Sequence, residues 1–142
     1  MMIPQEPASI PKTRPHILVV DDEPTNFDVI QMILGAAYSL DYSMDAENLD
    51  LKLSKSHYDA ILLDIMMPGT DGIAALNTIR STANIARIPV IMVTALADPQ
   101  TLTRAFEIGC NDYVTKPLQP QELRARLRHH LRMSDTAVAE AA

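Results

Sequence analysis

Short apolar runs recur along the chain, and each ends in polar or turn-forming residues. The clearest are residues 16–20, 60–63 and 88–93, which are rich in Val, Ile and Leu. Runs this short, bounded by turn residues, predict strands that are buried on both faces. Residues 38–43 instead alternate between apolar and polar side chains, which predicts a half-exposed edge strand. A short last strand is expected at residues 113–115.

Apolar positions three or four residues apart follow each of these strands and predict five helices. Three helices are expected to open at a proline, where the missing N–H costs nothing: these are Pro24, Pro99 and Pro120. Asp45 is expected to cap the second helix, and Thr70 or Asp71 the third. Gly109 is expected to end the fourth helix, and the last helix is expected to end near Met133.

Strands and helices therefore alternate five times along the chain. Such alternation predicts an α/β protein with a parallel sheet, right-handed crossovers and helices on both faces. For five strands we expect a doubly wound sheet of order 2-1-3-4-5, with its switch point between strands 1 and 3. We divide the chain into a flexible Pro-rich leader (1–14), one domain (15–133) and a C-terminal tail of small residues (134–142).

Composition narrows the class of protein further. The chain has 142 residues, 47% of them apolar and 21% charged, which suits one soluble domain with a proper core. A net charge of −6 argues against a nucleic-acid surface. The single cysteine, Cys110, excludes an internal disulfide and suits a reducing compartment. Neither a signal peptide nor a membrane-spanning run is evident, so we expect a cytoplasmic protein.

Candidate chemistry gathers where the strands end. Asp21, Asp22, Asp64, Thr94 and Lys116 stand at or just past the ends of four predicted strands. The carboxyl ends of parallel strands share one edge of the sheet, so we expect these side chains to converge there. Three carboxylates repel one another unless a cation joins them. The available cations are Lys116 and a metal ion. A set of oxygen ligands with no His or Cys nearby favours Mg²⁺ or Mn²⁺ as that metal.

An aspartate beside a metal and a lysine is suited to one reaction in particular. Asp64 is placed for nucleophilic attack on a phosphoryl group, which gives an aspartyl phosphate. The metal and Lys116 would offset the charge on the phosphoryl oxygens, and Thr94 would donate a hydrogen bond to one of them.

Four motifs resemble those of response-regulator receiver domains, in the same order and spacing. They are LVVDDE at 18–23, LDIMMPG at 63–69, VTA at 93–95 and DYVTKPL at 112–118. The resemblance covers about residues 15–133 and implies the (βα)5 flavodoxin-like receiver fold. It implies a two-component signalling switch, in which Asp64 accepts a phosphoryl group from a sensor histidine kinase or phosphotransfer protein.

The resemblance also implies roles for the other residues of the site. Mg²⁺ would be bound by Asp22, Asp64 and the backbone carbonyl of Met66, with Asp21 acting mainly through water. Lys116 would pair with the carboxylate or phosphate and precede a cis peptide bond to Pro117.

A switch of partner binding is implied as well. The Thr94 hydroxyl would move toward the phosphate and the Tyr113 ring would swing inward behind it. That movement would reshape a face made by the fourth helix, the last strand and the last helix, which binds a downstream protein.

Several alternatives stay open from the sequence. The chain is either a stand-alone regulator or the receiver part of a longer protein, and a homodimer through its last two helices is not decided. A pseudo-receiver that only docks partners is disfavoured by the complete set of Asp, Thr and Lys residues. An aspartate-nucleophile phosphatase needs a second acid two residues after the nucleophile, where Met66 stands. We therefore expect a phosphoacceptor rather than a turnover enzyme.

Smaller expectations concern residues around the site. Met66 and Leu96 flank the path of the attacking water in similar domains, and neither can orient a water, so we expect a long-lived aspartyl phosphate. Cys110 is expected to be a buried, inert thiol. The last helix carries His129 and His130 together with Arg124, Arg126, Arg128 and Arg132, and these side chains are expected to form a solvated basic face.

Overall fold

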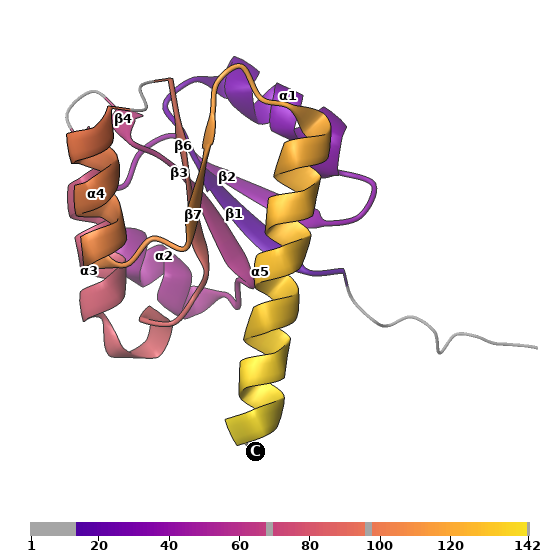
Figure 1. Ribbon diagram of the computed structural model, residues 1–142, viewed down its shortest axis with the longest axis vertical. Coiled ribbons are helices and arrows are strands. Elements are labelled where there is room, and N and C mark those ends of the chain that lie inside the picture. The colour runs from indigo at the N-terminus through magenta and orange to yellow at the C-terminus, as the bar shows by residue number, and fades with distance from the viewer. Residues whose placement is uncertain (1–13, 68–69, 96–97, 142) are drawn as a thin grey trace, which may run out of the picture.

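The structure is a computed structural model that describes residues 14–67, 70–95 and 98–141 (Figure 1). The main sheet is formed by β1 (His16–Val20), β2 (Ser39–Ser43), β3 (Ala60–Asp64), β6 (Val90–Thr94) and β7 (Asp112–Thr115). The helices are α1 (Pro24–Leu34), α2 (Leu49–Lys55), α3 (Gly72–Ser81), the short 3-10 helix η2 (Ala83–Ile85), α4 (Pro99–Ile108) and α5 (Pro120–Ala141).

All five strands of the main sheet are parallel and follow the order β2-β1-β3-β6-β7. This order confirms the predicted 2-1-3-4-5 topology. The chain reverses its direction of winding between β1 and β3, which are hydrogen-bonded neighbours at the centre of the sheet. Side chains at the carboxyl ends of these two strands therefore lie next to each other.

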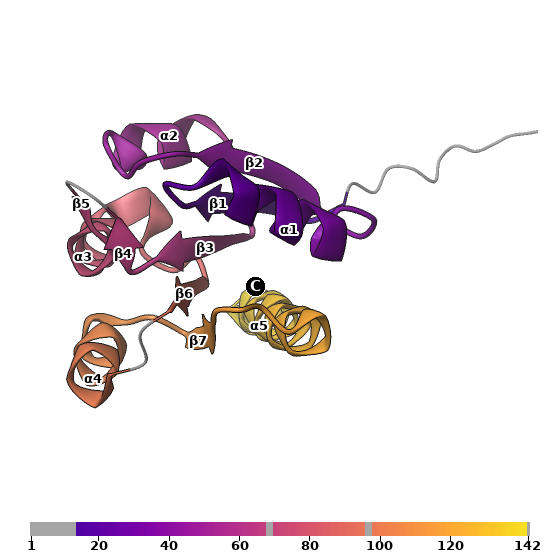
Figure 2. The same cartoon turned by 90° about the horizontal axis from the view of Figure 1, so that it is seen from above.

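Helices cover both faces of the sheet (Figure 2). One core cluster joins the sheet to α2, α3 and α4, and includes Leu53, Leu76 and Ala105. The other joins the opposite face to α1 and α5, and includes Leu34 and Leu127. The central strands are buried on both faces, as their uninterrupted apolar runs predict: every residue of β3 and β6 is buried.

Several helix ends are where the sequence predicts them. The Asp71 carboxylate caps α3 by accepting a hydrogen bond from the backbone N–H of Ile73 at 2.9 Å. Helix α4 begins after Asp98, whose carboxylate caps it, and ends at Gly109 with a positive φ of 128°. A φ in that region is readily adopted by glycine alone, which explains why the helix stops there.

Other predictions of local structure are wrong. Asn48, with φ of 54°, precedes α2, while the carboxylate of Asp45 accepts from the N–H of Glu47 within the turn before it. Helix α5 does not end near Met133 but continues to Ala141. Residues 134–141 contain neither Gly nor Pro and are rich in alanine, so nothing in them stops a helix.

Two further features bear on the predicted elements. The sequence did not predict an antiparallel pair of two-residue strands, β4 (Met66–Met67) and β5 (Thr70–Asp71). The predicted leader lies outside the described residues except for Arg14, whose guanidinium donates to the carbonyls of Gly35 and Ala36. Across the described part of the chain, no helix combines the length and apolar character that a membrane crossing requires.

Candidate functional site

Three carboxylates meet at the carboxyl edge of β1 and β3. Asp64 is the last residue of β3, and Asp21 and Asp22 directly follow β1. One ligand oxygen from each of the three lies within 4.8 Å of the others. Asp21 and Asp64 are almost fully buried, at 1% and 4% exposure, and Asp22 is half-buried. The convergence predicted from the strand ends is therefore present.

Lys116 enters this cluster from the loop that follows β7. Its Nζ donates to Oδ2 of Asp21 and to Oδ2 of Asp64, both at 3.2 Å. Burial alone would lower the pKa of Lys116, but the charges of the two carboxylates raise it above its usual value. The ammonium is therefore charged and bridges the two acids. The peptide bond to Pro117 is cis, as the resemblance implied.

Among the described residues, the Asp64 carboxylate has one hydrogen-bond donor on each oxygen. Oδ1 accepts from the backbone N–H of Met66 at 3.1 Å, and Oδ2 accepts from Lys116. Burial raises the pKa of Asp64, the Met66 N–H and Lys116 oppose that rise, and the nearby Asp21 adds to it. A buried carboxylate with so few partners is poorly stabilised, which suits a group that reacts rather than one that only supports the fold.

Helix α3 begins in direct contact with the backbone of the Asp64 segment. The N–H of Gly72 donates to the carbonyl of Ile65 at 3.0 Å. A Cβ atom on Gly72 would lie 2.3 Å from the carbonyl oxygen of Asp64 and 2.7 Å from the Cα of Ile65. Only glycine allows this approach, so Gly72 belongs to the framework of the site.

Asp21 is held far more firmly than Asp64. Its Oδ1 accepts from the N–H of Glu23 at 2.9 Å and from Nδ2 of Asn26 at 3.2 Å. Its backbone carbonyl accepts from the Tyr42 hydroxyl at 2.7 Å. The sequence did not indicate a role in the site for Asn26 or Tyr42, because neither residue stands at the carboxyl end of a strand.

Thr94 and Tyr113, the two predicted switch residues, occupy neighbouring strands. Thr94 is fully buried at the end of β6, and its backbone carbonyl accepts from the N–H of Lys116 at 2.9 Å. Tyr113 is half-buried in β7, and its ring lies edge-on to Phe106 of α4 with ring centres 6.2 Å apart. Tyr113 thus packs on the face of the sheet that α4 covers. Leu96 lies outside the described residues.

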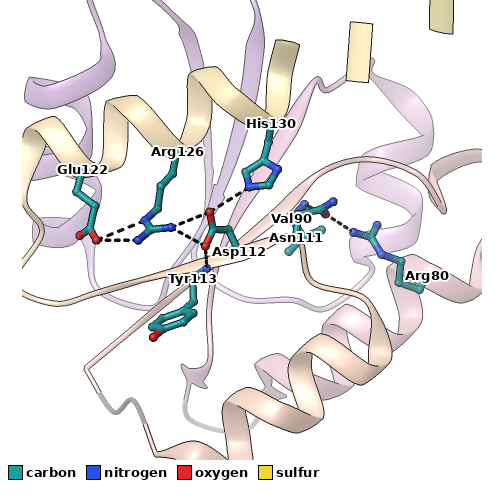
Figure 3. Close-up of polar contacts among 8 residues, drawn as sticks. All are labelled: Arg80, Val90, Asn111, Asp112, Tyr113, Glu122, Arg126 and His130. Atoms are coloured by element: carbon teal, nitrogen blue, oxygen red, sulfur yellow. Dashed lines mark hydrogen bonds and ion pairs between the residues drawn. The ribbon is translucent and has the colours of Figure 1, made fainter. Parts of the chain in front are cut away.

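Polar contacts on β7 correct part of the expectation of a solvated basic face on α5 (Figure 3). Arg124, Arg128, His129 and Arg132 are exposed as expected, but Arg126 and His130 are paired with Asp112. The Asp112 carboxylate accepts two hydrogen bonds from the guanidinium of Arg126, at 2.9 and 3.0 Å, and lies 3.0 Å from Nε2 of His130. Arg126 also pairs with Glu122 one turn earlier. Although burial alone would raise the pKa of Asp112, these partners lower it. Arg126 and His130 therefore fasten α5 to the sheet.

The donor set fits a small hard divalent cation. Three carboxylates against one ammonium leave two negative charges in the pocket. All available ligands are oxygens, the kind that Mg²⁺ prefers, and neither His nor Cys joins the cluster. Asp22 makes no hydrogen bond or ion pair with the residues that the structure describes, so its carboxylate is free to bind an ion.

The sheet is doubly wound and parallel, and an acidic cluster with one lysine lies at the carboxyl edge of its central strands. Together these features define a receiver-type α/β domain. Comparison with known families agrees with this class. The model described as the response regulator receiver domain matches residues 17–128, and the chain belongs to this family. It is a receiver domain of the kind found in two-component response regulators.

Curated relatives support the assignment. The chain is 35% identical over 122 residues to the "DNA-binding dual master transcriptional regulator RpaA" of Synechocystis, which covers 85% of this chain and 51% of the relative. It is 41% identical over 120 residues to the "Transcriptional regulatory protein ResD" of Bacillus subtilis, and this match covers 82% of this chain and 48% of the relative. The chain thus spans about half the length of the curated relatives it matches. The DNA binding named for RpaA therefore neither confirms nor contradicts the prediction that this chain does not bind nucleic acid directly.

Solved structures give the same picture. A putative response regulator from Chloroflexus aurantiacus is 31% identical, with a TM-score of 0.79 over 84% of this chain and 99% of that one. The receiver domain of a sensor histidine kinase from Pseudomonas aeruginosa is 32% identical, with a TM-score of 0.76 over 84% of this chain and 98% of that one. The latter was solved with a magnesium ion coordinated in its active-site cleft.

Proposed function

We propose that this receiver domain is a signalling switch in which Asp64 accepts a phosphoryl group from a phosphohistidine on a sensor histidine kinase or phosphotransfer protein. The observation that carries the proposal is the position of Lys116, whose Nζ is 3.2 Å from both Asp21 and Asp64 inside a buried acidic pocket. A lysine there compensates the carboxylates before transfer and the phosphoryl oxygens after it. We place the reaction in the cytoplasm and regard the protein as a phosphoacceptor rather than a turnover enzyme.

In the transfer step, an Oδ of Asp64 forms a bond to phosphorus while the P–N bond of the donor phosphohistidine breaks. The electron pair of that bond returns to the ring nitrogen, and the ring, whose other nitrogen carries a proton, leaves as neutral imidazole. The Lys116 ammonium turns from the carboxylate to a phosphoryl oxygen, and the Thr94 hydroxyl donates to another. Each of these residues already stands at the same edge of the sheet.

Mg²⁺ is the cofactor that we propose for this pocket. Asp22, Asp64 and the backbone carbonyl of Met66 would hold it directly, and Asp21 through water. When bound, it supplies positive charge to the phosphoryl oxygens. The two uncompensated negative charges of the pocket and the all-oxygen donor set support this assignment.

Phosphorylation is proposed to reach a partner through Thr94 and Tyr113. A Thr94 hydroxyl drawn toward the phosphate leaves room behind it, into which the Tyr113 ring moves from its half-buried position against Phe106. Because Phe106 is 45% exposed on α4, this movement changes the surface formed by α4, β7 and α5. We propose that a downstream protein, or a second copy of the chain, reads that surface.

A small phosphodonor tests the proposal without knowledge of the kinase. Acetyl phosphate with Mg²⁺ should add one phosphoryl group to the wild-type protein, detected by intact mass. Asp64→Asn should abolish the addition, while Asp50→Asn, an exposed carboxylate of α2, should not change it. An unlabelled wild-type protein, or equal labelling of Asp64→Asn, contradicts the proposal.

The alternative is a pseudo-receiver that docks partners without phosphorylation. The complete set of Asp64, Thr94 and Lys116 speaks against it, and the family comparisons do not favour it. A beryllofluoride titration distinguishes the two. A phosphoacceptor should show a saturable, Mg²⁺-dependent change in tyrosine fluorescence, which a pseudo-receiver should lack.

A further inference from the structure

The side chain of Asn26 connects the start of α1 with the acidic pocket. Its Nδ2 donates to both oxygens of Asp21, at 3.2 and 3.3 Å, and to Oε1 of Glu23 at 3.2 Å. An amide nitrogen carries two hydrogens and no charge, so it can hold carboxylates without neutralising them. Asp21 is buried to 1% exposure, which leaves it no water to take over these bonds.

The two neighbouring aspartates differ in how they are held. Asp21 accepts from Glu23 N–H, Asn26 and Lys116, and its orientation is fixed by three separate donors. Asp22 is half-buried and makes no hydrogen bond or ion pair within the described parts of the chain. The Asp22 carboxylate is thus free to bind an ion, whereas the orientation of the Asp21 carboxylate is fixed before an ion binds.

We propose that Asn26 is a positioning residue that presets Asp21 for a divalent cation. The inference rests on the proposed function, because it concerns the same pocket. Without the Asn26 amide, Asp21 would keep only the Glu23 N–H and Lys116 as donors. Its carboxylate would then rotate toward the ammonium, and a closer ion pair with Lys116 would compete with the cation.

A merely structural role for Asn26 leads to a different expectation. Asn26 stands near the first turn of α1, and alanine is a better helix former than asparagine. If the amide only supported the helix, Asn26→Ala would leave cation affinity unchanged. If it orients Asp21, cation affinity falls while the fold stays intact. Loss of a residue that orients a metal-site carboxylate typically costs about 10-fold or more in affinity.

The matched control is Gln31→Ala. Gln31 is an exposed amide on the same helix, and its side chain makes no hydrogen bond to the residues that the structure describes. Both substitutions remove an amide side chain and leave a methyl group in α1. They differ in whether the amide touches Asp21.

The experiment measures the dissociation constant for Mg²⁺ by titration calorimetry, together with the melting temperature without the ion. For Asn26→Ala we expect the constant to rise about 10-fold while the protein stays folded, although losing the hydrogen bonds to buried Asp21 lowers its melting temperature. Gln31→Ala should match the wild type, and Asn26→Ser, which keeps one donor, should lie between. In the wild type, the side-chain N–H₂ signals of Asn26 in a ¹⁵N spectrum should shift on adding Mg²⁺, and those of Gln31 should not.

Two negative outcomes are distinguishable. An Asn26→Ala protein that binds Mg²⁺ as tightly as the wild type, or Asn26 signals that ignore the ion, overturns the positioning role and leaves the proposed function standing. A wild-type protein that binds no Mg²⁺ overturns both.

Discussion

Replacing Gly72 by alanine tests whether the approach of α3 to Asp64 is as close as the structure shows. The added Cβ would lie 2.3 Å from the carbonyl oxygen of Asp64, 2.7 Å from the Cα of Ile65 and 2.9 Å from the Ile65 carbonyl oxygen. All three are backbone atoms, so no flexible side chain can move aside. Either α3 or the end of β3 has to shift.

Two opposing contributions decide the sign of the effect. Forcing an extra carbon into a packed site costs about 1–3 kcal/mol, and backbone neighbours put this case at the upper end. Alanine gains up to about 1 kcal/mol over glycine in a helix, and less at its first residue. We therefore expect Gly72→Ala to lower the free energy of unfolding by about 1–3 kcal/mol.

Urea unfolding at neutral pH measures this difference. With a slope of about 1–3 kcal/mol per molar urea, the midpoint should fall by roughly 1 M. Asn77→Ala, at an exposed position of α3, gains helix propensity without a clash and should be neutral or slightly stabilised. Because the clash displaces Asp64, labelling by acetyl phosphate should also be slower in Gly72→Ala. A midpoint equal to or above that of the wild type would refute the close approach.

Three further predictions concern single side chains. Met66→Asn should speed phosphate loss from Asp64 about fivefold, since one hydrogen bond that orients the attacking water is worth roughly 1 kcal/mol; equal or slower loss counts against it. Burial and then a hydrogen bond to Asp41 raise the pKa of Tyr58 to about 12. Its contribution to stability should therefore persist below about pH 10 and be lost between about pH 10 and 12, a loss that Tyr58→Phe should remove in denaturation curves. Burial, with Asp112 adding to it, raises the pKa of Cys110 to about 11, so a disulfide reagent should react with this thiol only in denaturant; prompt reaction in buffer contradicts its burial.

The central part of the fold follows from local pattern. Residues 60–63 and 90–93 are uninterrupted apolar runs, and such runs are stable only inside a sheet that is covered on both faces. Once these strands are parallel, their ends must share an edge, which is why the meeting of Asp21, Asp64 and Lys116 could be predicted. Their roles in phosphoryl transfer stay predictions until they are tested.

Features that depend on tertiary contacts could not be predicted from the sequence. Asn26 and the Asp112–Arg126 pair act through hydrogen bonds that leave no periodic signal, and a basic residue looks the same whether it is solvated or paired. The extension of α5 was missed because weak helix formers after Met133 looked like a boundary, although the alanines beyond them carry the helix on. Asn48 precedes α2 in a left-handed conformation that the turn imposes.

The Asp112 carboxylate described above also protects the border of the sheet. Strand β7 is the last in the sheet order, and the N–H of Lys116 faces its neighbour β6, so the N–H of Tyr113 faces outward. That outward group donates to Asp112 at 2.9 Å. A carboxylate thereby takes the place that the carbonyl of an added strand would occupy. A border whose outward N–H is already hydrogen-bonded gives other chains less to pair with, which limits edge-to-edge aggregation.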